Sequence, residues 1–187
     1  MVDEILVNAR DARVRTGRTS RAGVELNRAT GEISVWNDGD PIPVRFDAER
    51  GLWDPELIFG ELRSGESFND SEERLYGGRN GVGAKLTNIY SRWFRVEVVD
   101  AKRHKKYSQT WRENMTKKEP AIVEKSEAKE SRVRVSFLPD YARFGLPGLD
   151  ADTHALLSRR AFDLAATTPG LRVRLDGRRV PVRSLKE

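Results

Sequence analysis

The sequence predicts an α+β domain, a two-layer sandwich in which one mostly antiparallel sheet carries its helices on one face. Three observations predict this fold class. The chain has 187 residues, of which 37% are hydrophobic, enough for one domain with an ordinary core. Helical and strand-like segments are mixed along the chain, and most strand-like segments lie in its second half. No internal repeat or low-complexity segment interrupts this order.

Four segments have the features of helices. They are residues 1–15, 53–62, 84–93 and 150–166. The first contains no glycine or proline and consists mostly of good helix formers. The second opens with Asp54 before Pro55, which is the pattern of an N-cap followed by proline at the first helical position.

Alternating apolar and polar residues predict the strands. These are residues 32–36, 94–99, 106–111, 121–123, 132–137, 171–175 and 178–182. The strands from 94 to 137 are expected to form an antiparallel meander, and the last two a hairpin closed by a two-residue turn. Residues 16–31 are polar and turn-rich, with one apolar patch at Val24 and Leu26, so no strand is predicted there. Residues 63–83 form a long polar loop, and a loop of about 20 residues in a compact domain is usually functional.

Composition excludes several kinds of chemistry. Cysteine is absent and histidine occurs only at His104 and His154, which excludes a disulfide scaffold, a thiolate or histidine-rich metal site and a cysteine nucleophile. No run of about 18 apolar residues and no signal-peptide pattern is present, so we expect a soluble protein inside the cell. The net charge of +5 suits phosphate or nucleic-acid partners, although interleaved charges are also typical of a solvated surface.

A polar stripe on the first predicted helix is the first candidate site. Glu4, Asn8 and Asp11 fall within about 60° of arc, opposite Ile5 and Leu6. Carboxylate and amide oxygens are ligands that Mg²⁺ accepts, and a positioned glutamate can act as a general base. Taken alone, the stripe is more typical of a solvated helix face.

A glycine-rich run and a strand end are the other two candidates. Residues 77–85 hold four glycines in seven positions before a helix, which lets backbone N–H groups approach a phosphate, and Arg79 and Lys85 add charge. The run matches neither the Walker A nor the dinucleotide pattern, and a flexible connection is the alternative. Asn37-Asp-Gly39 directly follows a strand, and a polar side chain held at a strand end can form hydrogen bonds to the edge of a nucleotide base. The alternative interpretation of these residues is an ordinary turn.

Together these features resemble the GHKL (Bergerat-fold) ATPases. The detailed residue sequence of the motifs resembles eukaryotic-type or viral DNA topoisomerase II. The matching stretches cover essentially the whole chain. They are residues 4–8, 33–37, 57–60, 77–86, 109–111, 114–115, 143–145 and 159–163. The glycine run together with Gln109-Thr-Trp111 is specific, whereas residues 4–8 alone are not.

The resemblance implies a role for each matching residue. Glu4 would activate the water that attacks the γ-phosphate, Asn8 would hold the Mg²⁺ that bridges the phosphates, and Asn37 would contact the nucleotide. Ser67 would contact the sugar. The ATP lid around the triphosphate would comprise Gly78, Arg79, Asn80, Gly81, Val82, Gly83, Ala84 and Lys85.

The resemblance also implies cofactors, partners and a larger protein. The cofactors would be ATP and Mg²⁺, and the full enzyme would be a homodimer that acts on DNA, with no membrane partner. It would lie in the nucleus of a eukaryotic cell, or in the host cell or virion if viral. Residues 1–187 would be a single but incomplete ATP-binding domain without the N-terminal strap, transducer and DNA-cleavage domains, so we expect weak or no turnover by the chain alone.

Three positions depart from the family pattern. Ala12 stands where a second asparagine is usual, Pro41 replaces a glycine and removes an N–H, and Glu66 would repel a triphosphate. These departures keep a second hypothesis open, a degenerate GHKL-fold binding module that acts through protein or DNA contact without ATP turnover. A third is another GHKL enzyme, such as a chaperone or repair ATPase.

Overall fold

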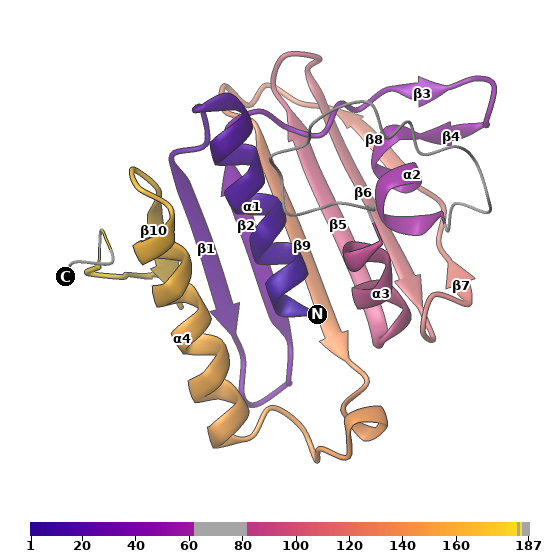
Figure 1. Cartoon of the computed structure of the whole chain (residues 1–187). Helices are drawn as coiled ribbons and strands as arrows, with labels where there is room; N and C mark the ends of the chain where they lie inside the picture. Colours follow the sequence, from indigo (N-terminus) through magenta and orange to yellow (C-terminus); the bar gives the residue numbers. More distant parts are fainter. Residues whose placement is uncertain (62–81, 183, 185–187) are drawn as a thin grey trace, which may run out of the picture.

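The computed structural model describes residues 1–61, 82–182 and 184, and it has the two-layer α+β architecture that the sequence predicts. In Figure 1 the helices lie in front of one large sheet. The helices are α1 (Val2–Thr16), α2 (Asp54–Gly60), α3 (Gly83–Ile89) and α4 (Ala151–Thr167), with a 3₁₀ turn η1 (Tyr141–Phe144). None of the helices in these residues is long and apolar enough to cross a membrane.

The large sheet joins strands from both halves of the chain. The strands are β1 (Arg21–Leu26), β2 (Ile33–Asp38), β5 (Ser91–Asp100), β6 (Lys105–Arg112), β7 (Lys117–Lys118), β8 (Ile122–Lys125), β9 (Arg132–Pro139), β10 (Arg172–Leu175) and β11 (Arg178–Arg179). Their order is β11-β10-β1-β2-β9-β5-β6-β7, and β8 pairs with β6. β1 and β10 run parallel, while the other pairs are antiparallel. A separate small hairpin is formed by β3 (Phe46–Asp47) and β4 (Leu52–Trp53), which the sequence patterns did not predict.

The long helices begin and end where their capping residues require. The α1 helix stops at Gly17, whose φ of 66° is left-handed and whose N–H donates to the Arg13 carbonyl. The α4 helix starts after Asp150, whose carboxylate accepts a 2.8 Å hydrogen bond from the Thr153 N–H. In α2 the expected N-cap was wrong, because Asp54 is the first helical residue and its carboxylate pairs with Arg45 instead.

Three other expectations needed correction. Residues 21–26 form the strand β1, in which Ala22 and Val24 are buried. The helix expected over 84–93 ends at Ile89, because the strand β5 already begins at Ser91. The predicted meander was wrong at its last strand, since β9 lies between β2 and β5 rather than beside β8.

The core lies between the sheet and the helices, and aromatic side chains fill its centre. Phe94 is completely buried, and its ring centroid lies 6.0–6.1 Å from those of Phe59, Trp111 and Phe137. Gly60 at the end of α2 lies directly on the Trp111 ring, where an added Cβ would come within 2.6 Å of Cζ2. The core therefore anchors α2 firmly against the sheet.

Candidate functional site

The polar stripe on α1 faces away from the core, as predicted. Glu4 and Asn8 are exposed and Asp11 is half-buried, while Ile5 and Leu6 on the opposite side are buried. Since Glu4 and Asn8 lie one helical turn apart, their side-chain oxygens project from the same side of α1.

The start of α3 lies against this stripe. A Cβ atom added to Gly83 would lie 2.5 Å from Cδ and 2.8 Å from Cγ of Glu4, so the glutamate side chain occupies the space that any other residue would need. The Thr87 hydroxyl donates to the Met1 carbonyl at 3.2 Å, which ties the two helices together. The structure thus brings the stripe and the end of the glycine run into contact.

The end of β2 supplies the third group. Asn37 is buried on the sheet face that carries the helices, and α1 packs against this strand. Its amide donates to the Asp38 carbonyl at 3.0 Å. Beyond it Gly39 has a φ of +100° and lies so close to Thr19 that an added Cβ would be 2.7 Å from the Thr19 Cα. Only glycine fits this turn.

Asp38 points to the other face of the sheet and has a structural role. Its carboxylate accepts hydrogen bonds of 2.7–2.8 Å from the N–H and hydroxyl of Ser20 and from the N–H and Nε of Arg21. Burial alone raises the pKa of Asp38, but the hydrogen bonds from Arg21 and Ser20 outweigh burial and lower it. Asp38 therefore holds the start of β1 to the end of β2 as a carboxylate, which the sequence patterns did not reveal.

The structure describes only part of the predicted lid. Val82 is exposed at the start of α3, whereas Ala84 and Lys85 are buried in it. Ala12 and Pro41, two departures from the family pattern, are half-buried. Several predicted residues lie outside the described ranges, namely Glu66, Ser67, Gly78, Arg79, Asn80 and Gly81.

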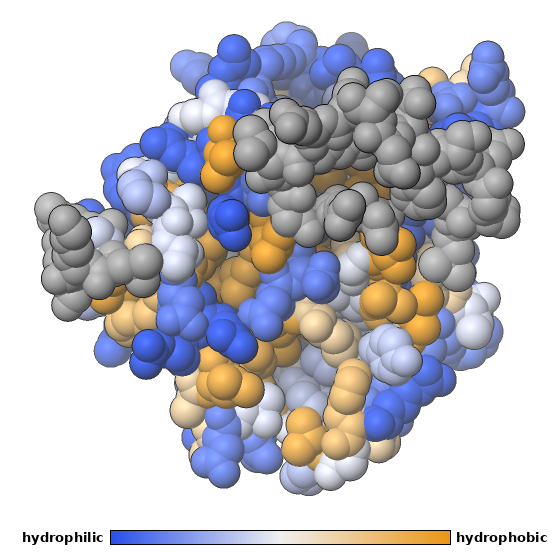
Figure 2. All heavy atoms as spheres, viewed as in Figure 1, coloured by the Kyte–Doolittle hydropathy of each residue, from blue (hydrophilic) through white to orange (hydrophobic). Residues whose placement is uncertain are grey.

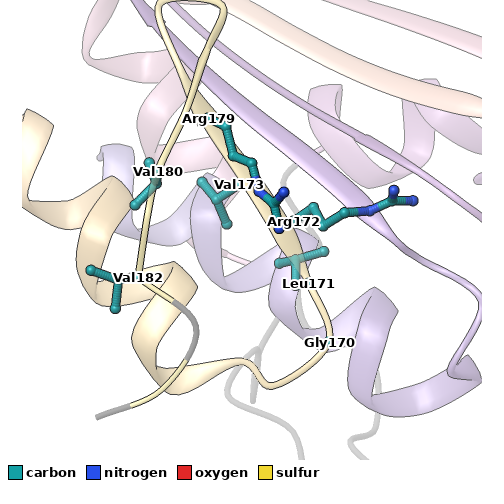
Figure 3. A pocket seen from close by; sticks show the side chains of 7 residues that line it. All are labelled: Gly170, Leu171, Arg172, Val173, Arg179, Val180 and Val182. Carbon is teal, nitrogen blue, oxygen red and sulfur yellow. The ribbon is translucent and has the colours of Figure 1, made fainter. Parts of the chain in front are cut away.

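Two hollows on the described surface lie away from these groups. One of about 320 Å³ lies between α1 and α4, where Arg160 pairs with Asp3 across it at 3.2 Å. Another of about 310 Å³ lies under the C-terminal hairpin, where Val173, Val180 and Val182 line it (Figure 3). Neither is lined by a predicted site residue. Figure 2 shows hydrophobic surface on the helix face, and Ile58 and Leu86 are exposed apolar residues of α2 and α3.

The exposed groups on α1 fit magnesium bound together with phosphates. Within residues 1–61 and 82–182, no three acidic or histidine side chains gather as a separate metal site. Mg²⁺ in nucleotide enzymes is usually held by one or two protein oxygens, waters and the substrate phosphates. Asn8 with Glu4 beside it is a donor set of that kind, and Asn8 presents its amide on the exposed side of α1.

Solved structures define the class of this fold. The chain is similar to the ATPase region of topoisomerase II from Saccharomyces cerevisiae, with a TM-score of 0.93 and 37% identity over 99% of this chain and 49% of that one. It is also similar to the 43K ATPase domain of gyrase B from Thermus thermophilus, with a TM-score of 0.70 and 25% identity over 95% and 43% of the two chains. The chain has the GHKL ATPase fold.

Sequence relatives define the family. The chain is 43% identical over 98% of its length to DNA topoisomerase 2 of Penicillium chrysogenum, and 46% identical over 89% of its length to that of Acanthamoeba polyphaga mimivirus. It spans 12% and 13% of the lengths of these relatives. No family model matches the chain. The chain is homologous to the ATPase region of eukaryotic-type DNA topoisomerase II.

Proposed function

We propose that this chain binds Mg-ATP between α1, the end of β2 and the start of α3. In a full-length topoisomerase II, ATP bound there would drive closure of the dimer and passage of one DNA segment through another. The contact between Glu4 and Gly83 carries the proposal, because it joins a general base to the glycine run expected to surround the phosphates. The homology to topoisomerase II ATPase regions supports it.

Each described group has a place in this reaction. Glu4 would accept a proton at its carboxylate from the water that attacks the γ-phosphate, while the bond from the γ-phosphorus to the bridging oxygen breaks and ADP leaves. Asn8 would hold Mg²⁺ through its amide oxygen, and the ion would supply positive charge against the phosphate oxygens. Asn37 would contact the nucleotide from the strand end, and the backbone at Gly83 could approach the phosphates because glycine has no side chain to intervene. Phosphoryl transfer depends mainly on such positioning and charge neutralisation.

The partners and location of the full enzyme belong to the same proposal. ATP is the ligand of this domain, while DNA and a second copy of the protein are partners in the full enzyme. In a eukaryotic cell the enzyme acts in the nucleus, and a viral enzyme acts in the host cell or virion.

Nucleotide binding by variants of α1 tests the proposal. Titration of the chain with a fluorescent ATP analogue and Mg²⁺ should give saturable binding that weakens about 10- to 100-fold in Asn8→Ala, because a contact to the charged complex contributes about 1.5–3 kcal/mol. Glu4→Gln should still bind, since the glutamate acts on the water.

The matched control is Asn27→Ala. Asn27 lies in the exposed turn between β1 and β2, where it accepts hydrogen bonds from Ala29 and Thr30. This variant should bind the analogue like the unchanged chain. Equal binding by all these variants would reject the site, and no saturable binding by the unchanged chain would favour a degenerate GHKL-fold binding module.

A further inference from the structure

The open face of the sheet, opposite the helices, carries a group of arginines from three strands. We call this group the arginine face. It consists of Arg21 on β1, Arg132 and Arg134 on β9, and Arg172 and Arg174 on β10. Their strands are β10, β1 and β9; β10 and β1 are neighbours in the sheet, β2 lies between β1 and β9, and neighbouring strands are about 4.8 Å apart.

Strand alternation sets the direction of these side chains. Val173 lies between Arg172 and Arg174 and is buried in the core under the helices, as is Val135 next to Arg134. Successive residues of a strand point to opposite faces, so the arginines project away from the helices. Register aligns them across strands, with Arg172 opposite Arg21.

A tryptophan lies flat beneath part of this face. An added Cβ on Gly23 would come within 2.5 Å of Cε2 of Trp36, so the indole covers the backbone of β1 at that glycine. The guanidinium of Arg132 lies 4.3 Å from the centroid of the Trp36 ring. Glycine and tryptophan therefore build a flat platform that holds Arg132 against the sheet.

Three of the five arginines, Arg132, Arg172 and Arg174, have no acidic partner among the described residues. The other two do. Arg21 pairs with Asp38 and Glu130, and Arg134 pairs with Glu25.

The remaining contacts are to neutral groups. Arg172 donates to the Ser20 hydroxyl at 3.5 Å, Arg174 donates to the Gly177 carbonyl at 3.2 Å, and Arg132 contacts Trp36. Arg179 of the neighbouring hairpin strand is opposite Arg174 in the register and is also exposed. The charge of this face is thus only partly compensated.

We propose that the arginine face binds the phosphate backbone of duplex DNA directly, independently of nucleotide. Guanidinium groups suit phosphate oxygens because they donate paired hydrogen bonds and stay charged. The face is also polar beyond Arg134, where the hydroxyls of Ser34 and Ser136 bond each other at 2.7 Å. Such a surface offers charged contacts to a phosphate backbone, and contacts of this kind carry no sequence information, so binding should be independent of DNA sequence.

Salt-dependent binding of a short labelled DNA duplex tests the proposal. The triple variant Arg132→Ala, Arg172→Ala and Arg174→Ala should weaken binding at least tenfold at about 50 mM salt. It should also reduce the slope of log K against log salt by about 2–3, because each phosphate contact contributes about 0.9 to the slope. A variant with lysine at the same three positions should keep most of the slope of log K against log salt, since lysine keeps the positive charge.

The matched control removes three arginines elsewhere. This control variant combines Arg15→Ala, Arg50→Ala and Arg159→Ala, at exposed positions on α1, the small hairpin turn and α4. It lowers the net charge by the same amount and should change the slope by less than about 0.5. If the alanine triple does not fold, as judged by circular dichroism, Arg172→Ala and Arg174→Ala are tested singly, with an expected loss in slope of about 1 each.

Four results would overturn the proposal. They are equal effects of both alanine triples, no duplex binding by the unchanged chain at low salt, an unchanged slope in the two single variants, and tighter binding to phosphatidylserine vesicles than to DNA. Asn8→Ala should leave DNA binding unchanged, so failure of the nucleotide site and failure of the arginine face are separate outcomes.

Discussion

Replacing Phe94 with alanine is expected to lower the free energy of unfolding by about 3–5 kcal/mol. Phe94 is 0% exposed and its ring contacts three other aromatic rings, from α2, β6 and β9. Removing the ring loses its burial and leaves a cavity that the surrounding β-sheet cannot fill. Urea unfolding followed by circular dichroism measures the change.

A surface phenylalanine provides the control. Phe46 is 53% exposed and touches Trp53 edge-on, with centroids 5.3 Å apart. Phe46→Ala should cost less than about 1.5 kcal/mol, the usual size of one such aromatic pair. Similar losses for the two variants would show that Phe94 is not at the centre of the core.

Replacing Gly83 with valine is expected to raise the dissociation constant for Mg-ATP at least tenfold. The new side chain would occupy the position of the Glu4 carboxylate and stand between α1 and α3, where the phosphates are proposed to bind. Fluorescent-analogue titration measures the loss. Stability should change less than binding, because the first atoms displaced are at the end of a flexible side chain.

The comparison variant for Gly83 is Leu86→Val in the same helix. Leu86 is 45% exposed, so this change adds a β-branched residue to α3 without approaching Glu4. It should leave nucleotide binding within about twofold, a change of about 0.4 kcal/mol. In the double variant Glu4→Ala, Gly83→Val, stability should recover while binding stays weak. Recovery of nucleotide binding in this double variant would show that the phosphates bind at another position.

Local patterns predicted most elements, and one failure has a clear physical cause. Residues 21–26 lie in a polar, turn-rich stretch whose apolar patch is Val24 and Leu26, yet they form β1, and Gly23 is needed there because Trp36 lies across the strand. Sequence alone could not show the position of β9, because its pairing with β2 is set by contacts between distant parts of the chain. The parallel pairing of β1 with β10 is likewise set by contacts between distant parts of the chain, so no local pattern could predict it.

The candidate site was predictable as residue types but not as geometry. Spacing on α1 correctly placed Glu4 and Asn8 on its exposed side. The approach of Gly83 to Glu4 joins two segments far apart in the sequence, and no local pattern contains it. Burial of Lys85 in α3 and the structural use of Asp38 likewise depend on packing across elements.

Nuclear magnetic resonance of the ¹⁵N-labelled chain titrated with Mg-ATP shows, residue by residue, whether the nucleotide binds between α1, the end of β2 and the start of α3. Binding of Mg-ATP at the proposed site should give saturable chemical-shift changes at the amides of Asn8, Asn37 and Gly83, which come from the three elements that form this site. Shifts confined to the hollow lined by residues 170–182, or no saturable shifts at all, would contradict it.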